Sequence, residues 1–93
     1  ALKSILHGNP DIPIYTASIT PAGVACAAEM ANGFFPVWMN PDRYDIFEKS
    51  VEEGFAAKGG GSLDSFDIAP FVTCLVNDNI EEARMGVKGR MAL

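Results

Sequence analysis

The amino-acid sequence predicts an α/β protein in which strands and helices alternate in the order β-α-β-α-β-α. Three short apolar runs, rich in β-branched and aromatic residues, are bounded by turn residues as strands are. Each run is followed by a segment with helix-start residues and apolar side chains on one helical face. Strands that alternate with helices of this length form right-handed crossovers, so the sheet should be parallel. Periodicity leaves open whether that sheet is open or part of a barrel.

The first strand is expected at residues 13–18 and leads directly into a helix at residues 21–32. Thr20 offers an N-cap hydroxyl, and Pro21 occupies the first helical position, where a missing N–H costs nothing. The helix is rich in alanine, so its buried face is narrow and can approach a sheet closely. The Asn32-Gly33 pair should end it, since glycine accepts the left-handed conformation.

The second strand is expected at residues 34–39, a nearly continuous apolar run typical of a parallel strand covered on both faces. Pro36 lacks a donor and predicts a bulge or an unpaired position. A helix should follow at residues 41–58, beginning at Asn40-Pro41 and ending at the glycines after Lys58. Its buried face is expected to contain Tyr44, Phe47, Val51 and Phe55.

The third strand is expected at residues 68–75, with Pro70 near its start, where a missing donor does least harm. A third helix should cover residues 79–93. Asp78 is the expected N-cap, with Glu81 at the spacing of a capping box.

Composition excludes several classes of protein. The net charge is −5 and the seven Lys and Arg residues are scattered, so nucleic acid is not an expected partner. No apolar run approaches the roughly 20 residues of a membrane helix, and residues 1–20 lack the pattern of a signal peptide. We therefore expect a soluble, cytoplasmic chain. Because it opens with Ala1 and stops at Leu93 within a helical pattern, we also expect it to be part of a longer protein.

No metal site is visible in the sequence. Cys26 and Cys74 show no CxxC pattern and are interpreted as buried free thiols rather than a disulfide. His7, the single histidine, has no ligand neighbour and is interpreted as a loop residue. The acidic residues of the second helix and its first turn fit a solvated face, where negative charge complements the helix dipole.

Ligands of parallel α/β proteins collect at the carboxyl ends of the strands, expected here at Ser18–Thr20, Met39–Pro41 and Val76–Asp78. The first of these joins a strand to a helix start, whose free amides attract phosphate. The same turn could simply cap its helix. Trp38 and Met39 could cover a planar ring, although core packing is the favoured interpretation.

Two motifs resemble the luciferase-like monooxygenase superfamily, above all its deazaflavin-dependent branch. Ala28-Glu29-Met30-Ala31-Asn32-Gly33 is similar to the family's Ala-Glu-x-Ala-Asp-Gly helix ending, with Asn32 in place of the usual aspartate. The segment Phe66–Leu93, in which Asn77-Asp78 leads into Ile80-Glu81-Glu82-Ala83-Arg84, is similar to the family's seventh strand and its helix.

The resemblance implies that residues 1–93 form a single partial segment of a TIM (β/α)8 barrel, three consecutive βα units near strands five to seven. It further implies a parent enzyme, an oxidoreductase that uses coenzyme F-420 or FMN. In the family, the turn after the fifth strand holds the cofactor phosphate, which corresponds here to Ser18, Ile19, Thr20, Ala22 and Gly23. The family's residues around the reactive ring come largely from earlier strands, so no catalytic residue is named.

Three units cannot close a barrel of about 250 residues, so the chain alone should show weak or no activity. Its open strand edges predict association with the remainder of the barrel or with a second copy, as a homo-oligomer. A small-molecule substrate is expected for the parent enzyme. The alternative is a free-standing small α/β module that binds a phosphorylated ligand or a protein without catalysis.

Overall fold

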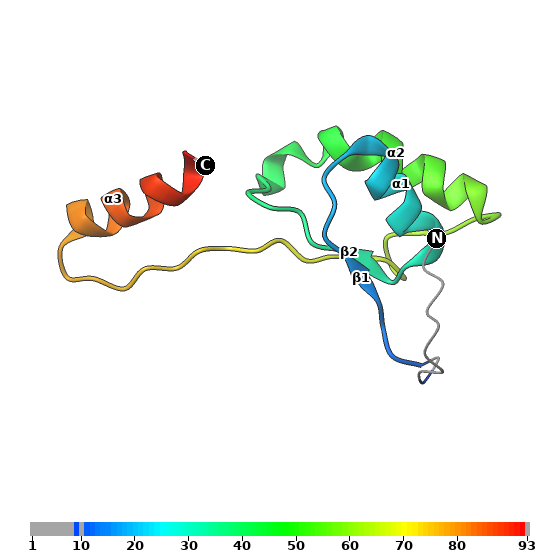
Figure 1. Cartoon of the computed structure of the whole chain (residues 1–93). Coiled ribbons are helices and arrows are strands. Elements are labelled where there is room, and N and C mark those ends of the chain that lie inside the picture. The colour runs from blue at the N-terminus through cyan, green and yellow to red at the C-terminus, as the bar shows by residue number, and fades with distance from the viewer. Residues whose placement is uncertain (1–8, 10, 93) are drawn as a thin grey trace.

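The computed structural model describes residue 9 and residues 11–92 of the chain. Strands and helices alternate as the sequence predicts, with a short 3-10 turn before the second helix (Figure 1). The elements are β1 (Tyr15–Thr16), α1 (Pro21–Met30), β2 (Gly33–Phe34), η1 (Pro41–Arg43), α2 (Asp45–Ala57), β3 (Asp67–Ile68) and α3 (Ile80–Met91).

The three strands form a parallel sheet in the order β1-β2-β3, which confirms the predicted fold class. Gly33 pairs with Tyr15 on one side and Asp67 on the other. A further parallel bridge joins Val37 to Phe71 beyond the named strands. The carboxyl ends of all three strands therefore lie at one edge of the sheet.

The strands are shorter than the expected ranges 13–18, 34–39 and 68–75, and this part of the prediction is wrong. Pro36 lacks a donor and separates β2 from the bridge at Val37, as the sequence predicts for a proline in this run. Hydrogen bonds nevertheless continue beyond the strand ends. The Phe35 amide donates to the Thr16 carbonyl over 2.8 Å.

The first helix ends earlier than the predicted range. Its last residue is Met30 instead of residue 32, and the Ala31 amide closes it by donating a hydrogen bond of 2.8 Å to the Ala27 carbonyl. Gly33 is a buried strand residue without a positive φ, and therefore not a left-handed cap. A Cβ there would overlap the Asp67 carbonyl oxygen and lie 2.6 Å from the Tyr15 ring. The glycine therefore serves the close approach of neighbouring strands.

The other two helices begin later than predicted. The expected helix 41–58 is divided into η1 and α2, because the Asn40 side chain caps the 3-10 turn through the Asp42 amide at 3.0 Å. The expected helix 79–93 begins at Ile80. Its N-cap is Asn79, which accepts from two first-turn amides, and not Asp78.

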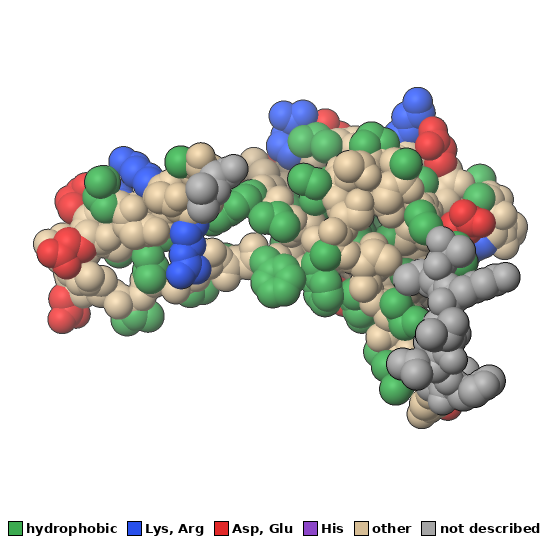
Figure 2. Space-filling view, in the orientation of Figure 1, with side chains coloured by type: hydrophobic (Ala, Val, Ile, Leu, Met, Phe, Trp, Pro, Cys, Tyr) green, Lys and Arg blue, Asp and Glu red, His purple; other side chains and the backbone are tan. Residues whose placement is uncertain are grey.

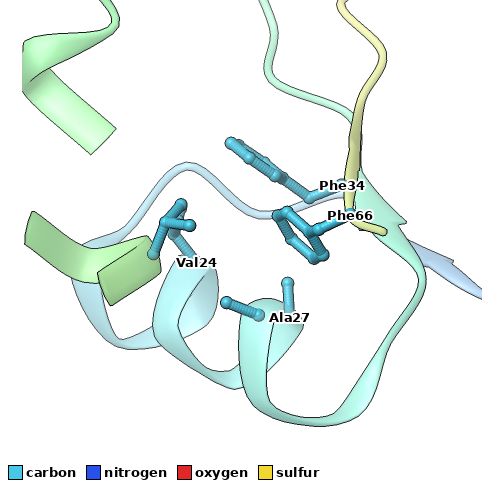
Figure 3. Close-up of a cluster of buried hydrophobic side chains, with 6 residues drawn as sticks. Val24, Ala27, Phe34 and Phe66 are labelled. Atoms are coloured by element: carbon cyan, nitrogen blue, oxygen red, sulfur yellow. The ribbon is translucent and has the colours of Figure 1, made fainter. Parts of the chain in front are cut away.

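One face of the sheet is covered by α1 and α2, and the core lies between these layers. Figure 3 shows Phe34 and Phe66 from the sheet side pointing toward Val24 and Ala27 of α1. The Phe34 ring is fully buried, with its centroid 6.0 Å from that of Phe66. The small side chains of α1 allow this approach, as its alanine content predicts.

Within the described residues no helix covers the opposite face of the sheet, which contains a row of aromatic rings. Tyr15 stacks on Phe35 with centroids 5.0 Å apart, and Phe35 contacts Phe71 at 5.3 Å. The Tyr15 hydroxyl donates to the Asp67 carboxylate over 3.1 Å, passing across Gly33. We call Tyr15, Phe35 and Phe71 the aromatic row.

The bond to Asp67 should make the phenol of Tyr15 difficult to ionise. The pKa of Tyr15 is raised above 10.0, first by this hydrogen bond, then by burial and by the carboxylate charge. The stability from this bond is therefore present below the unfolded phenol's pKa and lost as the pH rises through the folded one. Asp67→Asn should lower the pKa of Tyr15, measured from phenolate absorbance. Tyr44, whose pKa burial raises, is the internal control; an unchanged titration curve would contradict the bond.

The third helix packs little against the rest of the molecule, lying beside residues 73–75 and, through Met91, beside Trp38. It follows a long extended segment after β3 (Figure 1), and no residue of α3 is buried. The radius of gyration is 16.3 Å, against about 12 Å for a compact domain of this length. No helix within the described part of the chain is long and apolar enough to cross a membrane.

Candidate functional site

The predicted phosphate turn lies where β1 gives way to α1, at the carboxyl edge of the sheet. Thr20 is the N-cap of α1, and its Oγ1 accepts from the Gly23 amide over 3.2 Å. The Ser18 hydroxyl lies 3.2 Å from the same oxygen. The structure therefore brings both hydroxyls of the turn to the start of the helix.

Gly23 permits this arrangement. A Cβ on Gly23 would overlap the Ser18 side chain and lie 2.9 Å from the Thr20 hydroxyl oxygen. Because the glycine has no side chain, Ser18 can fold over the first turn of α1. The sequence-predicted residues Ser18, Thr20 and Gly23 thus form one compact unit.

The turn is open to solvent. Ile19, Thr20 and Ala22 are exposed, whereas Ser18 and Gly23 are half-buried. Pro21 has no amide hydrogen, and the Gly23 and Val24 amides are engaged by Thr20. The first-turn amide left for a ligand is that of Ala22.

Electrostatics also distinguish this helix start. The first turn of α1 contains no acidic residue, whereas α2 has Asp45 and Glu48 and α3 has Glu81 and Glu82 in their first turns. The partial positive charge of a helix N-terminus is offset by such carboxylates. At α1 it remains uncompensated by the helix's own side chains, so this turn can accept an anion.

Arg43 is the first basic residue after β2 in the sequence, and its side chain is already paired with a carboxylate. Its guanidinium donates two hydrogen bonds to Asp45, at 2.9 and 3.0 Å. This pairing holds the pKa of the Asp45 carboxyl below its usual value. Within the described residues no group of three His, Cys, Asp or Glu side chains could hold a metal ion.

The edge also holds an apolar hollow of about 270 Å³, which we call the Trp38 hollow. Trp38 is 44% exposed, so the expectation that it fills the core is wrong. The third strand was expected to end at Val76–Asp78. The last bridge lies instead at Phe71, so Val72 and Thr73, and not residues 76–78, lie at the carboxyl edge. The hollow is lined by Trp38, Met39, Asn40, Phe71, Val72, Thr73 and Met91.

The structure places none of the other described candidates in the turn or in the Trp38 hollow. The acidic residues of η1 and α2 are exposed, as the dipole argument predicts. Cys26 and Cys74 are free, but Cys26 is only half-buried and Cys74 is exposed, so their expected burial is wrong. His7 lies outside the described residues.

The profile of the luciferase-like monooxygenase family matches residues 3–93, nearly the whole chain. The chain belongs to this family. Its three parallel strands and three helices are accordingly βα units of the luciferase-like (β/α)8 fold.

Two curated relatives of this luciferase-like chain are oxidoreductases by name. A putative coenzyme F-420-dependent oxidoreductase of Mycobacterium tuberculosis is 34% identical over 95 residues, covering 100% of the chain and 27% of the relative. A 5,10-methylenetetrahydromethanopterin reductase of Archaeoglobus fulgidus is 29% identical over 73 residues, covering 78% of the chain and 22% of the relative. The chain thus spans about a quarter of the length of these relatives. No solved structure matches it.

Proposed function

We propose that this chain contributes the turn that holds the cofactor phosphate in an F-420- or FMN-dependent oxidoreductase. The observation that supports the proposal most directly is the open start of α1, with two hydroxyls and no acidic residue in its first turn. The relatives' names supply the class of chemistry, because one of them is described as dependent on coenzyme F-420.

The turn offers donors suited to a phosphate. The Ser18 and Thr20 hydroxyls share one hydrogen bond, which leaves one hydroxyl hydrogen for a ligand, and the Ala22 amide is the first-turn donor that Thr20 does not engage. Exposed Ile19 would contact the apolar part of the cofactor next to the phosphate, and Gly23 leaves room for Ser18. When bound, F-420 or FMN supplies the hydride-transfer chemistry. The part of these residues is to bind the phosphate and to fix the position of the cofactor.

We further propose that other strands and helices of the parent enzyme cover the exposed apolar surface of this chain. The aromatic row and α3, which buries none of its residues, present apolar surface that the remaining strands and helices of a barrel would cover. A second copy of the chain is the other candidate for this role. Reduction or oxidation of a small-molecule substrate would then take place in the assembled protein, and not in the isolated chain.

The phosphate turn can be tested by comparing FMN with riboflavin, which has the same ring and no phosphate. Calorimetric titration of the full chain should show FMN binding about tenfold or more tightly than riboflavin, since charge-assisted hydrogen bonds contribute about 1.5–3 kcal/mol each. Ser18→Ala and Thr20→Val should each reduce this difference. Asn79→Ala, which removes the cap of α3 instead, is the matched control and should leave it unchanged.

Equal affinity for FMN and riboflavin in the wild-type chain would refute the phosphate turn. Binding of inorganic phosphate as tight as that of FMN would instead favour the free-standing phosphate-binding module. Titration with F-420 in parallel separates the two cofactors, because both contain a phosphate but differ in the rest of the molecule.

A further inference from the structure

The Trp38 hollow has the lining of a site for an aromatic ligand. Its walls include Trp38 and Phe71, its polar groups are those of Asn40 and Thr73, and among the described residues no charged one lines it. Figure 2 shows apolar side chains gathered along the segment between the helical body and α3. A concave apolar surface with a few polar groups is the usual form of a small-molecule site.

Trp38 has a backbone conformation that core packing does not explain. Its φ is +55°, in the left-handed region that bulky residues rarely adopt. Such strain tends to occur where a side chain must be aimed at a ligand. The buried core is filled by other residues, among them Phe34 and Pro36, while the Trp38 side chain is 44% exposed. The strained conformation therefore directs a large ring into the hollow and not into the core.

Phe71, which lines the hollow together with Trp38, is held in position by the aromatic row. Phe71 is 67% exposed, yet its ring lies 5.3 Å from that of Phe35, which stacks in turn on Tyr15. The hydrogen bond from Tyr15 to Asp67 anchors the far end of this row. Phe71 is thus held in place although most of its surface faces solvent.

Asn40 supplies an oriented polar group. Its Oδ1 accepts from the Asp42 amide over 3.0 Å, and this bond leaves the Nδ2 donors of the same side chain for other partners. A donor beside two aromatic rings suits a ring that contains a carbonyl oxygen or a ring nitrogen.

We propose that the Trp38 hollow binds an uncharged planar ring, with Trp38 stacking on it and Phe71 forming the opposite wall. The volume of about 270 Å³ lies just below the range of about 300–1,000 Å³ of ordinary ligand pockets, so it suits one ring system and not a whole cofactor. The ring belongs either to the flavin-type cofactor or to the substrate. The inference goes beyond the phosphate turn but rests on the same proposed function for the identity of the ligand.

Two probes separate these sources. Riboflavin presents the cofactor ring without phosphate, and 2-naphthol presents an uncharged aromatic ring unrelated to the cofactor. Each is titrated into the full chain by calorimetry. Fluorescence gives a second readout, because Trp38 is the single tryptophan and a ring stacked on it should quench its emission. Saturable binding of either probe, with quenching, is expected, and the tighter probe identifies the source of the ring.

The decisive variant is Trp38→Gly. Glycine accepts the positive φ without strain, so the fold should be retained while the stacking surface is lost. We expect at least tenfold weaker binding of the preferred probe. The matched control, Val76→Ala, removes a fully exposed apolar side chain outside the hollow and should bind as the wild type does.

Unchanged affinity in Trp38→Gly, or failure of both probes to bind the wild-type chain, would overturn the proposal. The phosphate turn is judged separately, by the preference for FMN over riboflavin. Loss of probe binding in Trp38→Gly without an FMN preference would leave the hollow standing and refute the turn. An FMN preference with no effect of Trp38→Gly would do the reverse.

Discussion

Phe34→Ala should destabilise the folded chain by about 3–5 kcal/mol, the cost of truncating a fully buried phenylalanine. The Phe34 ring is completely inaccessible and contacts Phe47 and Phe66 at centroid distances of 5.5 and 6.0 Å. Removing it would leave a cavity where α1, α2 and the sheet meet. A domain of this size has a total stability of about 5–14 kcal/mol, so much of it would be lost. Denaturant unfolding followed by circular dichroism measures the change.

Phe71→Ala is the matched control, because the same side chain is removed from the uncovered face. Phe71 is 67% exposed and contacts one ring of the aromatic row. Its removal should cost less than about 1.5 kcal/mol, the upper value for an aromatic pair. Equal losses for the two variants would mean that the layer between α1 and the sheet is not the core of the molecule.

The alternation of strands and helices was predictable because its signals are local. Thr20 and Pro21 mark a helix start wherever they occur together before an alanine-rich segment, and the structure has the cap at Thr20. The glycines after Lys58 likewise end α2, since Gly59 and Gly60 both adopt positive φ. Such features depend on a few neighbouring residues and require no tertiary partner.

Strand length and the position of α3 were not predictable in this way. Residues 68–75 have the composition of a buried strand, but a strand forms only where a partner lies beside it. After the bridge at Phe71 no strand is paired to this segment in the described structure, and Val72 and Val76 are exposed. The apolar pattern of residues 68–75 therefore indicates side chains suited to burial, but those after Phe71 are largely exposed in the described structure.

The two parts of the candidate site differ in the same respect. The geometry of the turn after β1 was predictable because Ser18, Thr20 and Gly23 are close in sequence and their arrangement follows from the cap. Phosphate binding there remains a proposal. The Trp38 hollow combines Trp38 with Phe71, which parallel pairing brings together across 33 residues of chain. The positive φ of Trp38 has no signal in the sequence, because nothing in its residue type favours that conformation.

Gly54→Val should destabilise the chain by about 3 kcal/mol, the upper end of the usual cost of overpacking. Gly54 lies where α2 crosses α1. A Cβ there would overlap the Ala25 carbonyl oxygen and lie 2.6 Å from the Ala28 Cβ. Both neighbours belong to the backbone or its first side-chain carbon, so neither can turn aside, and the two helices would have to separate. Separation would expose the buried face of α1 that covers Phe34. Thermal unfolding of the full chain should show the loss as a transition many degrees lower.

Gly89→Ala isolates the effect of helix propensity from that of the helix crossing. Gly89 lies in α3 with nothing within 4 Å of an added Cβ, and alanine is favoured over glycine in a helix interior by about 1 kcal/mol. This variant should raise helicity slightly and leave the unfolding of the α1–α2 layer unchanged. Gly54→Ala is the matching variant in α2, where helix propensity also favours alanine. If Gly54→Ala destabilises the chain, the loss must come from contact of the added Cβ with α1. If Gly54→Ala instead matched Gly89→Ala, the close crossing of α1 and α2 would be wrong, and with it the rigid support that positions the start of α1 at the edge of the sheet.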